Sequence, residues 1–313
     1  MTIRLSRFAK ELLPPLLVKA LKRFTHPSRS LVTPQEPVVP TPIPIEYQYK
    51  NFSIYLPPDH KLPLYQRENL KYDRFLPHLA KFLGSNDTVI DIGANCGDTL
   101  AGMVEANEKV SYICIEPDDI FFGYLESNIQ RIKNHIPGLS IQTVKSLVGK
   151  SVSSVSLEGV GGTKHAVLSD HSQGLYTAKT LDELSKEFLF LNIKVLKTDV
   201  DGFDYDVIDS GTDLLIKHKP IIFFECQTDT ESQKLGFIST INRLKTIGYV
   251  DWVVFDNYGE VVLKTTDLDN IFQLINYVWQ QNLHNSTRTI FYYDILANTE
   301  DTRAFVGTVL KQY

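Results

Sequence analysis

The chain has 313 residues, 43% hydrophobic and 22% charged, an ordinary globular composition that suits one large α/β domain with appendages or two small domains. Its formal net charge of −5 excludes nucleic-acid binding through a broadly basic surface. Three scattered cysteines form neither a disulfide framework nor a zinc pattern, and they indicate a reducing, cytoplasmic location.

The first 30 residues form a basic segment unlike the rest of the chain. Residues 1–24 are amphipathic and are interrupted by Pro14 and Pro15, which one straight helix cannot contain. Such a segment either anchors peripherally to an anionic membrane surface at the inner face of the membrane or docks on protein, and both alternatives stay open. No apolar stretch approaches the roughly 20 residues that span a bilayer.

Three further parts of the chain follow the basic segment. Residues 31–46 are proline-rich and predict an extended linker. The main α/β domain is predicted at 47–296, and the tail at 297–313 carries a weak helical pattern.

The central feature of the main domain is a glycine turn that follows a buried strand predicted at 88–92. The turn passes through Gly93 and Gly97 into a helix at 99–106, and it presents free backbone N–H groups to a ligand. Its spacing, Asp-x-Gly-x-x-x-Gly, is not that of dinucleotide binders, and Asp91 would repel a pyrophosphate. A cofactor with positive charge fits better, and S-adenosylmethionine carries both a sulfonium and an ammonium group.

A second carboxylate, Glu116, follows the next buried strand, predicted at 110–115. Ligands of parallel α/β sheets bind at the carboxyl ends of adjacent strands, so Glu116 is predicted to accept the ribose hydroxyls of an adenosine. Alternatively, Pro117 and Asp118 mark the start of a helix at 120–133, and both interpretations can hold.

Three more carboxylates follow later strands. Asp199 and Asp201 come after a strand at 193–196, and Glu225 ends an apolar strand at 221–224. Structural acids normally scatter over exposed faces, so acids gathered at one sheet edge indicate a site. The other predicted elements are an edge strand at 47–55, a helix at 62–83, strands at 139–144 and 152–157, a loop at 159–174, helices at 180–190, 237–248 and 267–283, and strands at 250–255 and 288–293.

Several of these stretches resemble one known family. Thr-Val-Ile-Asp-Ile-Gly-Ala-Asn-Cys-Gly-Asp-Thr at 88–99 is similar to motif I of the S-adenosylmethionine-dependent methyltransferases, and Ile-Glu-Pro-Asp at 115–118 resembles their acidic loop. Thr-Leu-Asp-Glu-Leu at 180–184, Lys-Thr-Asp-Val-Asp-Gly-Phe-Asp at 197–204 and the strand at 221–225 resemble the FkbM-type subgroup in order and spacing. The resemblance covers roughly residues 70–293 and departs at Asp201, where the family commonly has glutamate.

The resemblance implies an α/β fold of the class I methyltransferase (Rossmann-like) type, with a seven-stranded sheet, the last strand antiparallel and helices on both faces. It also implies transfer of a methyl group from S-adenosylmethionine to an oxygen. Many bacterial members act on sugars of surface polysaccharides or glycolipids, so the expected partner is a saccharide or glycolipid acceptor in polysaccharide biosynthesis.

Residue roles follow from the matching positions. Backbone and polar contacts to the methionine portion are assigned to Gly93, Ala94, Asn95 and Gly97, the ammonium to Asp91, the ribose to Glu116 with Pro117, and the adenine region to Ser146. Asp199, Asp201 and Glu225 are the candidates for acceptor positioning and general base, with Lys197 orienting them. The same three acids could bind magnesium, but a metal-free base is preferred because no further ligand set is visible.

Other classes of protein are less compatible with these motifs. A nicotinamide-dependent oxidoreductase would carry the tighter glycine fingerprint. An adenosine-binding scaffold without catalysis would need no acids after the later strands, and a methyltransferase acting on amino groups would carry an Asn/Asp-Pro-Pro-Tyr type of motif that is absent. A non-sugar small molecule stays open as the acceptor.

Overall fold

The computed structural model describes residues 43–150, 155–158, 165–168 and 177–313, with the two short internal ranges described by their backbone alone. Residues 43–313 form one compact unit. The basic segment predicted at 1–30, most of the linker predicted at 31–46 and most of the loop predicted at 159–174 lie outside the described residues. Among the helices of the described part, none is both long and apolar enough to cross a membrane.

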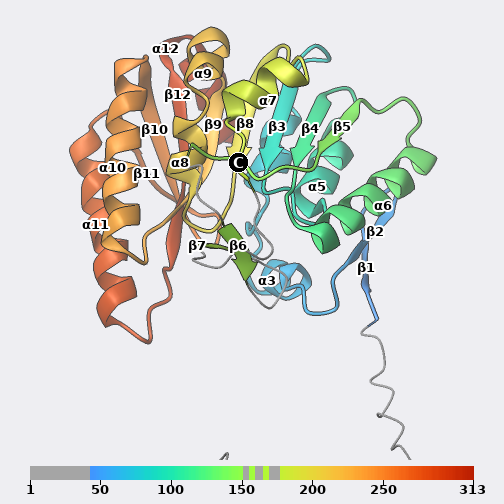
Figure 1. Ribbon diagram of the computed structural model, residues 1–313, viewed down its shortest axis with the longest axis horizontal. Coiled ribbons are helices and arrows are strands. Elements are labelled where there is room, and N and C mark those ends of the chain that lie inside the picture. The colour runs from blue at the N-terminus through green and yellow to red at the C-terminus, as the bar shows by residue number, and fades with distance from the viewer. Residues whose placement is uncertain (1–42, 151–154, 159–164, 169–176) are drawn as a thin grey trace, which may run out of the picture. The chain divides into compact units, whose positions relative to one another are not determined.

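An eight-stranded sheet runs through this unit (Figure 1). In spatial order its strands are β11 (Val261–Thr265), β10 (Tyr249–Asp256), β12 (Tyr292–Thr299), β9 (Ile221–Gln227), β8 (Ile193–Thr198), β3 (Thr88–Ile92), β4 (Ser111–Ile115) and β5 (Ile141–Val144). Strands β5, β4, β3, β8 and β9 are parallel, whereas β12 lies antiparallel between β9 and β10. The predicted α/β class with an antiparallel last strand is confirmed, but the predicted count of seven strands is wrong.

The strand that the prediction missed is β11, which pairs antiparallel with β10 at the edge of the sheet. Its side chains alternate between half-buried and exposed, so it lacks the continuous apolar run that marks a buried strand. The strand predicted at 152–157 is not part of this sheet either. It corresponds to β6 (Val155–Glu158), which forms a separate hairpin with β7 (His165–Leu168).

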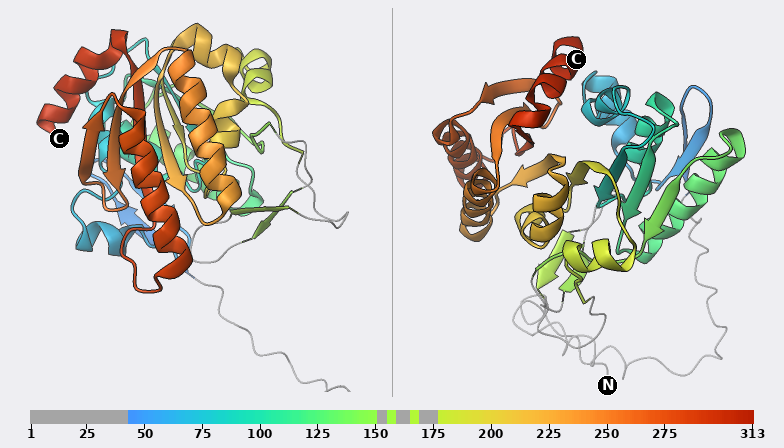
Figure 2. Two further views of the ribbon diagram at one scale, coloured as in Figure 1. Left: turned by 90° about the vertical axis from the view of Figure 1, so that its left-hand side faces the viewer. Right: turned by 90° about the horizontal axis from the view of Figure 1, so that it is seen from above.

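Helices cover both faces of the sheet (Figure 2). One face packs against α4 (Phe75–Ala80), α5 (Asp98–Ala106), α6 (Asp119–His135) and α12 (Glu300–Gln312). The other face packs against α7 (Leu181–Glu187), α8 (Asp204–Asp209), α9 (Thr212–His218), α10 (Glu231–Thr246) and α11 (Leu268–His284). Because side chains alternate along a strand, Val89 belongs to the first core, and Ile90 and Ile92 belong to the second.

The segment before the central strand differs from its prediction in two places. The single helix predicted at 62–83 is two helices, α3 (Leu62–Glu68) and α4. Pro77 is tolerated only in the first turn of a helix, so a helix containing it has to begin just upstream. The edge strand predicted at 47–55 is a hairpin of β1 (Ile45–Gln48) and β2 (Ser53–Leu56).

The end of the chain continues the same core. The strand predicted at 288–293 begins four residues later, at Tyr292, and β12 runs on to Thr299, past the predicted start of the tail at residue 297. Helix α12 then begins at a capping box formed by Thr299 and Thr302. It buries Val306 and Val309 in the first core.

Candidate active site

A cavity of about 570 Å³ lies at the carboxyl ends of the parallel strands. Its wall includes residues from the loops that follow β3, β4, β5 and β8, together with residues of β9 and β12. From β3 the sheet order runs to β4 on one side and to β8 on the other, so the cavity straddles the point at which the strand order reverses. Open α/β sheets bind ligands at such a switch point, and the volume is that of a small-molecule site.

The glycine turn after β3 forms one wall of the cavity through Gly93 and Asn95. Gly93 has a φ of +75°, and a Cβ atom placed there would lie 2.0 Å from the backbone oxygen of Asp199. Only glycine allows the β3 and β8 loops to touch backbone to backbone at this point. Ala94 and Gly97 do not line the cavity. They shape the turn, since Ala94 N–H donates to the Ile115 oxygen and Gly97 N–H donates to the Ala94 oxygen.

Glu116 joins the glycine turn to the start of α6. Its Oε2 accepts the Asn95 N–H at 2.9 Å, and its Oε1 accepts the Asp118 N–H at 2.8 Å. Burial raises the pKa of Glu116 to about 7, although the two backbone N–H groups act in the opposite direction. Asp118 in turn caps α6 by accepting the N–H groups of Ile120 and Phe121. The helix start at this stretch is confirmed. Glu116 and Pro117 also lie on the cavity wall, and the ribose contact of Glu116 stays a prediction.

Asp91 lies behind the wall of the cavity and not on it. Its Oδ1 stands 2.9 Å from the Nζ of Lys197, and Lys197 also donates to the Gly93 oxygen at 2.9 Å and lies 3.7 Å from Asp199 Oδ2. Burial alone would lower the pKa of Lys197, but the carboxylates of Asp91 and Asp199 raise it above its usual value. Lys197 is therefore the cationic partner of Asp91 among the described residues, and it links β3, the glycine turn and β8.

Of the predicted site residues, the structure brings most to one cavity. Those on its wall are Gly93, Asn95, Glu116, Pro117, Ser146, Asp199, Asp201 and Glu225, and those outside it are Asp91, Ala94 and Gly97.

The predicted site residues omit several acids of the cavity wall, among them Asp73 and Asp294. Asp294 lies directly opposite Glu225 in the ladder of β12 and β9. Burial, reinforced by the charge of Asp199, raises the pKa of both Glu225 and Asp294 well above the usual range. A lone acid within the apolar run of β12 was the available signal for Asp294, whereas nothing local marked Asp73.

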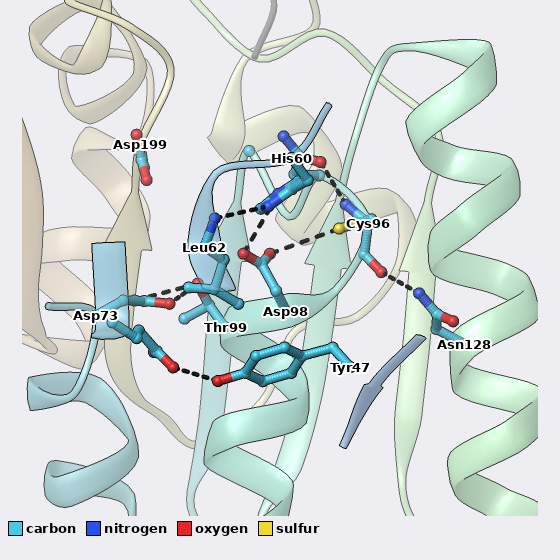
Figure 3. A network of polar contacts seen from close by, with 12 residues as sticks. Tyr47, His60, Leu62, Asp73, Cys96, Asp98, Thr99, Asn128 and Asp199 are labelled. Atoms are coloured by element: carbon cyan, nitrogen blue, oxygen red, sulfur yellow. Dashed lines mark hydrogen bonds and ion pairs between the residues drawn. The ribbon is translucent and has the colours of Figure 1, made fainter. Parts of the chain in front are cut away.

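A polar network on the wall joins the segment before α3 to the glycine turn, as Figure 3 shows. His60 Nε2 lies 3.6 Å from Asp98 Oδ2, and its Nδ1 faces the Leu62 N–H. Among the described residues, His60, Cys96 and Asp98 form the group whose potential metal ligands all lie within 4.8 Å of one another. Burial raises the pKa of the Cys96 thiol well above its usual value. In the same described part, Asp199, Asp201 and Glu225 do not form such a group.

An antiparallel β12 between β9 and β10, with helices on both faces, is the architecture of a class I methyltransferase. The chain belongs to the methyltransferase FkbM domain family, whose model matches residues 91–275.

Similar solved structures share little sequence with this chain. One is the methyltransferase FkbM from Methylobacillus flagellatus KT, with 13% identity and a TM-score of 0.39 over 69% of this chain and 44% of that one, so the chain spans less than half of its length. Another is the plantazolicin methyltransferase BpumL in complex with SAH, with 10% identity and a TM-score of 0.36 over 76% and 88% of the two chains. No curated protein matches the sequence.

Proposed function

We propose that this methyltransferase is an S-adenosylmethionine-dependent O-methyltransferase that acts on a hydroxyl group of a saccharide or glycolipid. The observation that carries the proposal is one cavity at the β3–β8 switch point, which joins the glycine turn and Glu116 on one side to Asp199 and Glu225 on the other. Cofactor and acceptor would thus share one enclosure, as direct transfer between them requires.

The residues on the β3–β4–β5 side fit an adenosyl cofactor. Gly93 lies on the cavity wall, and Glu116 holds the turn while it presents carboxylate oxygen to the cavity, where hydroxyl groups can donate to it. Ser146 follows β5 on the same wall, beyond Glu116 in the order of the strands. S-adenosylmethionine would supply the methyl group from its sulfonium, which leaves as a neutral thioether.

The residues on the β8–β9 side fit a hydroxyl acceptor. Asp199 reaches the cavity with its side chain 53% exposed, and Lys197 stands 3.7 Å away. We assign to Asp199 the acceptance of the hydroxyl proton as the acceptor oxygen forms its bond to the methyl carbon. Asp201, held in the left-handed region with a φ of 52°, and Glu225 position the acceptor.

Calorimetric titration with S-adenosylmethionine and S-adenosylhomocysteine tests the cofactor half of the proposal. We expect dissociation constants on the order of micromolar for the wild type and at least roughly tenfold weaker binding for Glu116→Gln, which loses the carboxylate charge. Glu108→Gln is the matched control, because Glu108 is exposed and lies outside the cavity. If the wild type bound neither S-adenosylmethionine nor S-adenosylhomocysteine, the proposal would be overturned.

Transfer of a labelled methyl group to saccharide and glycolipid acceptors tests the acceptor half of the proposal. Asp199→Asn should reduce turnover by roughly two orders of magnitude or more, while binding of S-adenosylhomocysteine stays within about threefold of the wild type. Unchanged turnover in Asp199→Asn would remove Asp199 from the proton transfer. Labelling of an amino group in place of a hydroxyl would contradict O-methylation.

A further inference from the structure

Segments on both flanks of the range that the family model matches contribute residues to the cavity wall. Gly93, Glu116 and Ser146, on the cofactor side, lie inside the range that the family model matches, 91–275. The opposite side receives residues from both flanks of that range: Tyr65, Tyr72 and Asp73 precede it, and Tyr292 and Asp294 follow it. The flanking segments thus form part of the cavity wall.

These flanking residues are held in place by contacts among the elements around the cavity. The rings of Tyr65 and Tyr72 meet edge to face with centroids 5.1 Å apart. Asp73 follows in a left-handed conformation, and the Thr99 hydroxyl at the start of α5 lies 3.5 Å from its carboxylate. From the last residue described, the Tyr313 hydroxyl donates to the backbone oxygens of Lys71 and Gly259. These contacts anchor this part of the wall to the rest of the domain.

The acceptor chamber is defined here as Tyr65, Tyr72, Asp73, Glu225, Tyr292 and Asp294. Acidic groups strongly outnumber lysines around the cavity as a whole, which is lined by nine Asp and Glu residues and two lysines. One of these lysines, Lys197, already contacts Asp91, and the other, Lys61, is exposed on the segment that leads into α3. The chamber thus holds carboxylates with little cationic compensation.

Glu225 offers a ligand a buried carboxylate oxygen that lacks a hydrogen-bond donor in the described part of the chain. Only 7% of the residue is exposed, it lies on the cavity wall, and its Oε2 has no hydrogen-bond partner among the described residues. A buried carboxylate oxygen without a partner is costly, and a donor supplied by a ligand relieves that cost. The raised pKa values of Glu225 and Asp294 have the same origin, which is burial together with neighbouring negative charge.

We propose that the acceptor chamber binds a hydroxylated ring that carries no negative charge, and that it prefers a ring bearing an amine. Tyrosine rings offer flat surfaces to the apolar face of such a ring, and carboxylates accept hydrogen bonds from its hydroxyl and ammonium groups. A carboxylate or phosphate on the ligand would instead place further negative charge beside Asp73, Glu225 and Asp294, where burial already raises the pKa of each carboxyl group and disfavours its charged form. This inference rests on the proposed function, because it concerns the acceptor half of the same cavity.

Saturation-transfer NMR on the protein saturated with S-adenosylhomocysteine tests the charge selectivity. The probes are D-glucosamine, methyl α-D-glucopyranoside and D-glucuronate, which share a ring and differ in charge. We expect D-glucosamine to bind roughly fivefold or more tightly than the neutral glycoside, and D-glucuronate to give no transfer. Binding of D-glucuronate as tight as that of D-glucosamine, or no transfer to any of the three, would overturn the inference.

Two near-isosteric variants test whether Asp294 and Asp73 cause the preference for D-glucosamine. In Asp294→Asn and Asp73→Asn the advantage of D-glucosamine over the neutral glycoside should fall at least roughly fivefold, because one carboxylate is lost while the shape is kept. Asp301→Asn is the matched control, since Asp301 is exposed on α12 outside the cavity, and it should behave as the wild type. An unchanged advantage in both chamber variants would contradict the assignment.

Calorimetry with S-adenosylhomocysteine on the same samples separates this inference from the proposed function. If the proteins bind S-adenosylhomocysteine but show no charge selectivity, the acceptor chamber is wrong and the cofactor side stands. If S-adenosylhomocysteine does not bind, the proposed function fails before the chamber is reached. The same titration confirms that each variant is folded.

Discussion

At the scale of single residues, the site depends on backbone positions as much as on side chains. Gly93 is the clearest case, because its missing side chain lets the β3 and β8 loops meet. Glu116 is a second case, since both of its oxygens accept backbone N–H groups of the loops beside it. Neither residue needs to touch a ligand in order to be essential to the geometry of the cavity.

Substitution of Gly93 should show this directly. In Gly93→Ala the new Cβ would lie 2.0 Å from the Asp199 oxygen at a φ of +75°, so we expect a loss of roughly 2–4 kcal/mol in the free energy of unfolding. Gly123→Ala on α6 is the control, because nothing lies within 4 Å of its added Cβ, and the change there should be neutral or stabilising. Denaturant unfolding measures both, and equal effects in the two variants would contradict the role of Gly93.

The raised pKa of Glu116 predicts a pH dependence of cofactor binding. Below about pH 7 the carboxyl group is protonated and accepts fewer hydrogen bonds, so affinity for S-adenosylhomocysteine should fall as the pH drops through about 7 and level off above it. The stability of the free protein should change with pH in the opposite direction. Because folding raises this pKa above 4.5, the stability it contributes is present at low pH and lost as the pH rises through about 7.

Calorimetry across this pH range measures the affinity for S-adenosylhomocysteine, and chemical unfolding of the free protein measures its stability. Together they check both pH dependences. Glu116→Gln should flatten both profiles, since the amide does not titrate. A binding profile that keeps its step near pH 7 in Glu116→Gln would assign the titration to another group.

At the scale of elements, β3 and β8 are joined by more than their ladder of hydrogen bonds. Asp91 and Lys197 are paired in register across the two strands and form an ion pair with 1% and 5% of their side chains exposed. An ion pair of this kind adds little net stability over apolar residues, but removal of one partner leaves a buried charge. We therefore expect the pair to act mainly by fixing the two strand ends at the switch point.

A double-mutant cycle tests this reading of the pair. Lys197→Met should destabilise the protein by roughly 3–5 kcal/mol, and adding Asp91→Asn should restore a large part of the loss, because no buried charge then remains. The exposed pair of Lys186 and Asp213, 3.2 Å apart, is the control, and Lys186→Met should cost less than about 1 kcal/mol. Additive effects of the two core substitutions would refute the coupling.

The elements also show how far the sequence could be interpreted. Buried parallel strands such as β3, β4 and β9 are mostly apolar. The predicted bounds of β3 coincide with the observed ones, those of β4 differ by one residue, and β9 runs three residues further than predicted. β11 and the hairpin of β6 and β7 were not assigned correctly, because short or half-exposed strands depend on their pairing partners more than on their own pattern.

The candidate site divides in the same way. Glycines and acids that directly follow strands were predictable, because the turn after a parallel strand always faces the ligand edge. Asp73 and Asp294 were not, since their place on the wall depends on how the flanking segments pack against the family domain. Asp91 was predictable as a motif residue, but its pairing with Lys197 depends on the register of β3 and β8.

At the scale of the whole molecule, the cavity links segments that are far apart in the chain. Its wall extends from His60 to Asp294, and the residues described from 43 to 313 form one compact unit. A ligand bound to one part of such a unit should stabilise all of it. Unfolding should accordingly be one cooperative transition that shifts as a whole.

Thermal unfolding with S-adenosylhomocysteine tests this coupling and separates the two sides of the cavity. At about 100 times the dissociation constant, the ligand should stabilise the folded state by about 2.7 kcal/mol, which raises the melting temperature by several degrees in a protein of this size. Asp294→Asn should keep the full shift because Asp294 lies on the acceptor side, whereas Glu116→Gln should lose much of it at the same ligand concentration. Two transitions of which only one responds to the ligand would show that the flanking segments fold independently of the family domain, and the acceptor chamber would then lose its structural basis.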